Sequence, residues 1–139
     1  MRKYQILEHK ADLKIEVFGK TKEELFENAV IGMQRAADYK PTKQPTNKQL
    51  TTKQLKIKSV DLPSLLVDFL SEVLYLIETE KLVFEKVEFE KFTEKEIEAN
   101  LIGKPLKRMG VHIKGVTYHD LDISQKKDGT WRATILFDI

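Results

Sequence analysis

Two carboxylates at the end of the chain are the first groups in the sequence that could do chemistry. Residues 131–139 (WRATILFDI) alternate as a strand does, and the sequence stops on Asp138 and the carboxylate of Ile139. Most domains end in a frayed polar tail, so an apolar end indicates a terminus that is fixed in place. Two hard oxygen donors on a rigid element make half of a site for Ca²⁺ or Mg²⁺. A solvated strand end beside a core residue explains the same stretch, and these residues alone leave both interpretations open.

Asp12 is a third carboxylate that a strand could direct into a site. Residues 12–18 (DLKIEVF) alternate polar and apolar side chains, which predicts a half-buried strand that ends at Gly19. Asp12 lies on the polar face at the beginning of this strand. His9 lies three residues earlier and could reach the Asp12 carboxylate, although such a lone pair is a weak signal.

The motifs of the common enzyme classes are absent from the sequence. There is no P-loop, no dinucleotide fingerprint and no nucleophile elbow. The chain has no cysteine, and its three histidines are not at zinc-motif spacing. No motif in the sequence requires an enzyme, and we expect a non-catalytic protein. A stand-alone metal-dependent hydrolase would need a general acid–base group beside the metal, and His9 is the only obvious candidate.

The composition is that of an ordinary globular protein. At 139 residues, with 41% hydrophobic and 33% charged residues, we expect one domain over residues 1–139. No apolar run approaches the roughly 20 residues of a membrane span. The N-terminal residues lack the apolar region of a signal peptide, so we expect a cytoplasmic protein without a membrane partner.

The net charge of +2 conceals an uneven distribution of charge. Residues 39–60 hold six lysines and no acid, and residues 99–119 hold four basic residues and no acid. Such segments are compatible with an RNA or an acidic protein as partner. They are equally compatible with solvated lysines, and a lysine-studded strand also protects an exposed sheet edge.

Two helices and a series of strands must position these residues. The capping box at Thr21 predicts a first helix of about four turns, and Asp61 followed by Pro63 opens a second, largely buried helix. Extended segments are predicted at residues 4–7, 12–18, 50–60, 80–92, 94–102, 116–123 and 131–139, with loops at 38–47 and 103–115 and a hairpin turn at 127–129. The sequence predicts an α+β fold with two helices packed on a mixed or mostly antiparallel sheet, in the order β-β-α-β-α-β-β-β-β.

Four blocks in this order resemble the archease family. They are residues 7–33, 61–80, 113–123 and 131–139, and they are distributed along the chain from residue 7 to its last residue. The H-x-A-D motif of the family is matched by residues 9–12, its terminal F-D-I by residues 137–139, and its V-K-A-V-T-Y by residues 113–118.

The resemblance implies a function by activation. Archeases are small partners of the RtcB-type tRNA-splicing ligase, and they promote transfer of GMP to the ligase and its multiple turnover. By residue matching, the family's divalent cation, often Ca²⁺ with Mg²⁺ or Mn²⁺ as alternatives, would be held by Asp12, Asp138 and Ile139. Lys114 and His9 would face the ligase or a phosphate, and contact with tRNA would be indirect. The alternative function is a small basic RNA-binding module that acts without the ligase.

Overall fold

The computed structural model describes residues 2–8, 12–43 and 50–139, and it confirms the predicted α+β class. The described elements form two antiparallel sheets and two helices. In chain order they are β1 Tyr4–Glu8, β2 Asp12–Gly19, α1 Lys22–Ala36, β3 Lys40–Pro41, β4 Thr51–Lys58, α2 Leu62–Glu80, β5 Leu82–Phe92, β6 Glu96–Arg108, β7 Gly115–Gln125 and β8 Trp131–Asp138.

The first sheet has the strand order β1-β2-β8-β7, so the C-terminal strand β8 lies between β2 and β7. In the second sheet β6 is the shared strand, because β3, β4 and β5 all pair with it. Every pairing between the described strands is antiparallel. The predicted strand order lacks only the two-residue strand β3, which falls inside the predicted loop at residues 38–47.

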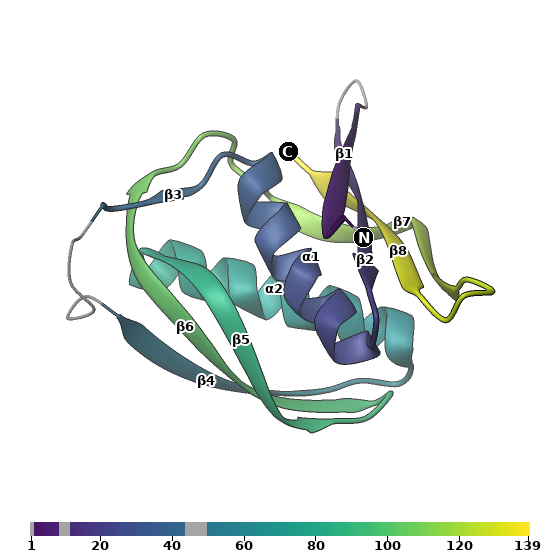
Figure 1. The fold of residues 1–139 in the computed structure, drawn as a ribbon. Helices are drawn as coiled ribbons and strands as arrows, with labels where there is room; N and C mark the ends of the chain where they lie inside the picture. The colour runs from purple at the N-terminus through teal and green to yellow at the C-terminus, as the bar shows by residue number, and fades with distance from the viewer. Residues whose placement is uncertain (1, 9–11, 44–49) are drawn as a thin grey trace.

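Both helices lie between the two sheets (Figure 1). Helix α1 packs on β1, β2 and β5, whereas α2 packs on β7, β4 and β5. The apolar side chains of both helices and both sheets form one core cluster. The alternating residues Ala133, Ile135 and Phe137 of β8 are fully buried in it, as the sequence pattern predicts. The sheet end that carries Asp138 is thus fixed by the core.

The two helix starts are confirmed by their capping hydrogen bonds. The Thr21 hydroxyl accepts a bond of 3.1 Å from the Glu24 N–H, and the Asp61 carboxylate accepts one of 2.8 Å from the Ser64 N–H. Each bond satisfies one of the N–H groups that a helix leaves unpaired at its N-terminus. Helix α2 then continues to Glu80, and Lys81 ends it in a left-handed conformation with φ of 54°.

The predicted loop at residues 103–115 is partly wrong. Strand β6 continues to Arg108, because Pro105 and Leu106 lie in register with Leu82 of β5 and Pro41 of β3. Only residues 109–114 connect β6 to β7 without strand structure. A side chain at Gly103 would bring its Cβ to 2.6 Å from the Val83 carbonyl oxygen, so glycine allows the close pairing of β5 and β6.

The edge of β5 that faces α1 is covered by helix side chains. The Gln34 amide accepts a hydrogen bond of 2.8 Å from the Phe84 N–H and donates one of 2.7 Å to the Phe84 carbonyl. The Glu27 carboxylate accepts a bond of 2.9 Å from the Val87 N–H. Side chains of α1 therefore satisfy strand groups that would otherwise be buried without partners. No helix in the described ranges has the length and apolarity needed to cross a membrane.

Candidate metal centre

Asp12 and Asp138 lie directly opposite each other at one end of the first sheet. The register of β2 and β8 pairs Asp12 with Asp138 and the next residues, Leu13 and Phe137, with each other. Directly opposed residues project to the same face of an antiparallel pair, with Cβ atoms about 4.5–5.5 Å apart. Asp12 is half-buried and Asp138 is exposed. Two carboxylates from opposite ends of the sequence thus share one face at the rim of the sheet.

Lys114 joins this end of the sheet through its main chain. Its N–H donates a hydrogen bond of 2.7 Å to the carbonyl oxygen of Asp138, and the following residue, Gly115, is the cross-strand partner of Asp138 in β7. Lys114 itself is exposed, whereas Ile139 is half-buried and packs against the core. His9 lies outside the described residues.

The chemistry of these donors fits a hard divalent cation with several open coordination positions. Like charges directly opposite each other on a sheet are destabilising, and a bound cation would relieve that repulsion. Carboxylate and main-chain oxygens are the donors that Ca²⁺ and Mg²⁺ prefer. Within the described ranges no three or more His, Asp or Glu side chains gather as a metal cluster. Asp12, Asp138 and the main-chain oxygens of Ile139 would leave positions for water or a partner's phosphate oxygens.

Tyr39 contacts the residue before Lys114, and no local pattern in the sequence predicts this contact. The Tyr39 hydroxyl accepts a hydrogen bond of 3.2 Å from the Ile113 N–H, and both residues are almost fully buried. Burial raises the pKa of the Tyr39 hydroxyl above its usual 10.0, against the lowering effect of the Ile113 N–H. The phenol therefore stays neutral at physiological pH. Only the folded chain brings residue 39 next to residue 113.

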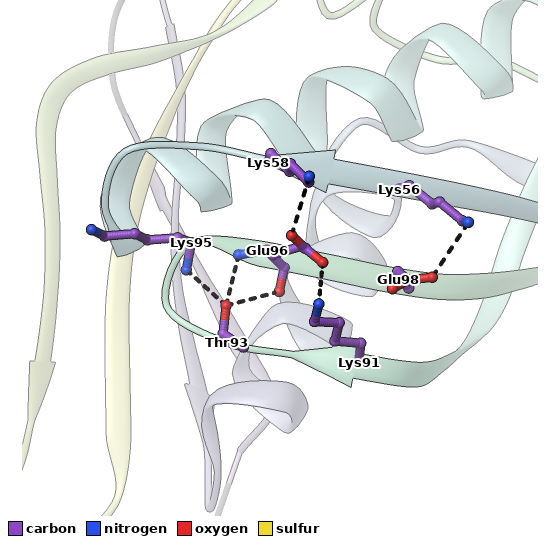
Figure 2. Close-up of polar contacts among 7 residues, drawn as sticks. All are labelled: Lys56, Lys58, Lys91, Thr93, Lys95, Glu96 and Glu98. Carbon is purple, nitrogen blue, oxygen red and sulfur yellow. Dashed lines mark hydrogen bonds and ion pairs between the residues drawn. The ribbon is translucent and has the colours of Figure 1, made fainter.

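Two lysines of the first basic segment, Lys56 and Lys58, lie beside acids of the neighbouring strand β6. Across the pairing of β4 with β6, the Lys56 Nζ lies 3.5 Å from the Glu98 carboxylate and the Lys58 Nζ lies 3.7 Å from the Glu96 carboxylate (Figure 2). Lys91 of β5 approaches Glu96 from the other side, and its hydrogen bond is the main cause of the lowered pKa of Glu96. The outer face of the second sheet is therefore a ladder of alternating charges and not a positive surface.

Further lysines of the basic segments 39–60 and 99–119 also lie beside acidic side chains. Lys53 forms an ion pair with Glu80 at the end of α2, and Lys104 lies 3.5 Å from Glu85. Asp68 and Glu72 lie four residues apart on α2, and both are half-buried. Asp68 there accepts a hydrogen bond of 2.9 Å from the Ser59 hydroxyl, which gives this carboxylate a structural role.

The fold and the site define a small α+β protein in which two antiparallel sheets enclose two helices and two aspartates meet at a sheet end. The family model of the Archease protein family (MTH1598/TM1083) matches residues 4–139. The protein archease of Methanosarcina barkeri is 36% identical to this chain, over 99% of it and 97% of the relative. The chain belongs to the archease family.

Two solved structures show the same fold. A protein from Methanobacterium thermoautotrophicum superimposes with a TM-score of 0.70 at 21% identity, covering all of both chains. A protein from Thermotoga maritima, described as an archease and possible chaperone, superimposes with a TM-score of 0.68 at 20% identity, over all of this chain and 98% of that one. Both likenesses extend the match of the fold to the full length of the chain.

Proposed function

We propose that this chain is a non-catalytic protein cofactor that activates an RtcB-type RNA ligase in tRNA splicing, by promoting transfer of GMP to the ligase and its multiple turnover. Membership of the archease family supports a partner role of this kind. The observation that carries the proposal is the opposition of Asp12 and Asp138, with the main chain of Lys114 bonded to Asp138. Both residues lie on strands whose other face is buried in the core, so the pairing of the strands holds the two main-chain positions opposite each other.

The residues of this site have separate roles in the proposal. Asp12, Asp138 and the main-chain oxygens of Ile139 would hold a divalent cation, probed first with Ca²⁺ and then with Mg²⁺ or Mn²⁺. The cation would supply positive charge for phosphate oxygens of the ligase-bound nucleotide. Lys114, which is exposed and makes no ion pair with a described residue, adds a second positive charge at the same rim. His9, by its match to the family motif, would face the ligase or a phosphate.

The test is multiple-turnover RNA ligation by an RtcB-type ligase from the same organism, with ligase and GTP limiting. Addition of this chain, tagged at the N-terminus only, is expected to raise turnover and the fraction of guanylylated ligase together. The isolated chain is expected to show no turnover of nucleotides or phosphodiesters, which separates an activator from a metal-dependent hydrolase. Equal turnover with and without the chain would overturn the activator proposal.

The alternative of an independent RNA-binding module has less support from the surface charges. Nucleic-acid binding of this kind depends on lysines that can release counterions from phosphates. Lys53, Lys56 and Lys58 of β4 are each next to a glutamate, so they are poor candidates for that role. Tight, strongly salt-dependent RNA binding in the absence of ligase would favour the alternative.

A further inference from the structure

The segment at residues 109–114 is hydrogen-bonded near its start to the two residues that follow helix α1. The Gly110 N–H donates a hydrogen bond of 3.1 Å to the Asp38 carbonyl, and the Val111 N–H donates one of 2.8 Å to the Ala37 carbonyl. In Figure 1 this segment passes the end of α1 on its way from β6 to β7. Its last residue is Lys114, so its path sets the position of Lys114.

Two side chains hold the middle of the segment. His112 lies 2.8 Å from the Glu78 carboxylate of α2, but both side chains are substantially exposed, and solvent weakens such a pair. Tyr39 is different, because it is 4% exposed and its hydroxyl accepts from the N–H of Ile113, which is 1% exposed. A buried N–H that loses its acceptor is costly, so the Tyr39 bond is the stronger constraint.

We propose that Tyr39 is a positioning residue that fixes the main chain of Lys114 beside Asp138, acting through the Ile113 N–H. The chain of contacts is continuous: the Tyr39 hydroxyl holds residue 113, and the N–H of residue 114 is bonded to the Asp138 carbonyl at 2.7 Å. The consequence for ligase activation rests on the proposed function, whereas the fixing of Lys114 does not. The position of Lys114, which faces the ligase in the proposed function, thus depends on a buried phenol just beyond the end of α1.

Tyr39→Phe removes the acceptor and keeps the ring in the core, and Tyr75→Phe on the exposed face of α2 is the matched control. Hydrogen exchange of backbone amides, followed by NMR, reports on the segment directly. In Tyr39→Phe the Ile113 and Lys114 amides are expected to exchange about tenfold faster, as for loss of one buried hydrogen bond. Amides of β2 and α2 are expected to keep their rates, as is every amide in the control.

Gly110→Ala is a second variant that leaves the phenol intact. A Cβ at this position would lie 2.7 Å from the Ala37 carbonyl oxygen, so the segment must shift away from α1. We expect the same local acceleration of exchange at residues 113 and 114. Faster exchange at residues 113 and 114 in both variants would show that displacement of the segment is the cause, because Gly110→Ala keeps the Tyr39 phenol.

With the ligase, Tyr39→Phe is expected to lower the maximal stimulation of guanylylation several-fold and to leave the half-maximal concentration unchanged. A purely structural role would alter neither quantity after correction for the folded fraction. The proposal is overturned if the amides of residues 113 and 114 exchange in Tyr39→Phe at the wild-type rate. It is also overturned if these amides exchange faster but the variant still stimulates guanylylation fully. If the wild-type chain itself fails to stimulate, the proposed function fails, and the exchange rates still decide whether Tyr39 fixes Lys114.

Discussion

Asp12 and Asp138 are cross-strand partners in register, at the point where β2 begins and β8 ends. Their strands are held by fully buried residues such as Ile15 and Ile135, so the main-chain positions of the two aspartates stay opposite each other. A fixed pair of like charges is a disadvantage for stability on its own. Binding of a cation or a cationic partner would remove this repulsion and stabilise the folded chain.

Divalent cations are expected to stabilise the folded chain. Ligand binding to the native state alone adds about 2.7 kcal/mol to the free energy of unfolding at 100 times the dissociation constant. We therefore predict that saturating Ca²⁺ raises the melting temperature by several degrees in calorimetry. Asp138→Asn is expected to abolish this increase, and Asp122→Asn, on the exposed part of β7, is expected to retain it. An equal increase in both variants would place the cation elsewhere.

Replacing Gln34 is expected to destabilise the fold strongly. Gln34 is 2% exposed and satisfies both main-chain groups of Phe84, so Gln34→Ala leaves a buried donor and a buried acceptor without partners. At about 1–3 kcal/mol for each of the two groups, the expected loss is about 2–6 kcal/mol in urea unfolding. Gln54→Ala, at an exposed position of β4, is the control and is expected to change stability little. A small loss for Gln34→Ala would show that water replaces the amide.

The helix cap at Asp61 is expected to make the stability of the folded chain depend on pH. The Ser64 N–H lowers the pKa of Asp61 from its usual 3.8, so the ionised carboxylate is favoured in the folded chain. This stabilisation is complete above the unfolded pKa and is lost as the pH falls through the lower folded pKa. The difference in melting temperature between wild type and Asp61→Ala should therefore narrow below about pH 4. A difference independent of pH would contradict the ionised cap.

The charge ladder on the second sheet leads to a prediction about RNA. Glu96→Gln combined with Glu98→Gln would leave Lys56, Lys58 and Lys91 without their acidic partners. We predict weak RNA binding by the wild-type chain and tighter binding, with a steeper dependence on salt, by the double variant. Filter-binding titrations at two salt concentrations measure both quantities. Tight binding by the wild-type chain that the double variant does not exceed would support the RNA-module alternative.

Local signals in the sequence predict the helix starts and the buried face of β8 well. Thr21 and Asp61 act through hydrogen bonds to residues three positions away, and strand alternation is a property of neighbouring residues. The division into two sheets depends instead on pairings between distant segments. Strand β6 continues through Gly103 and Pro105 because β3 and β5 pair with it, and glycine and proline alone indicate a loop.

The candidate site was predictable as residue types but not as an arrangement. The sequence shows Asp12 and Asp138 as carboxylates at the ends of predicted strands. The resemblance to the archease family predicts that both belong to one site. Their opposition follows from the register of β2 with β8, which no local pattern encodes. Tyr39 could not be predicted at all, because its contact with Ile113 depends on how the end of α1 meets the segment before β7.

The most direct test of the central claim is guanylylation of a limiting RtcB-type ligase, measured as covalent transfer of labelled GMP, with four versions of this chain. The wild-type chain and Asp122→Asn are expected to stimulate transfer equally. Asp12→Asn and Asp138→Asn, measured separately, are expected to lose most of the stimulation while remaining folded by circular dichroism. Stimulation by both of these variants at the wild-type level would contradict a role for the Asp12–Asp138 pair in activation.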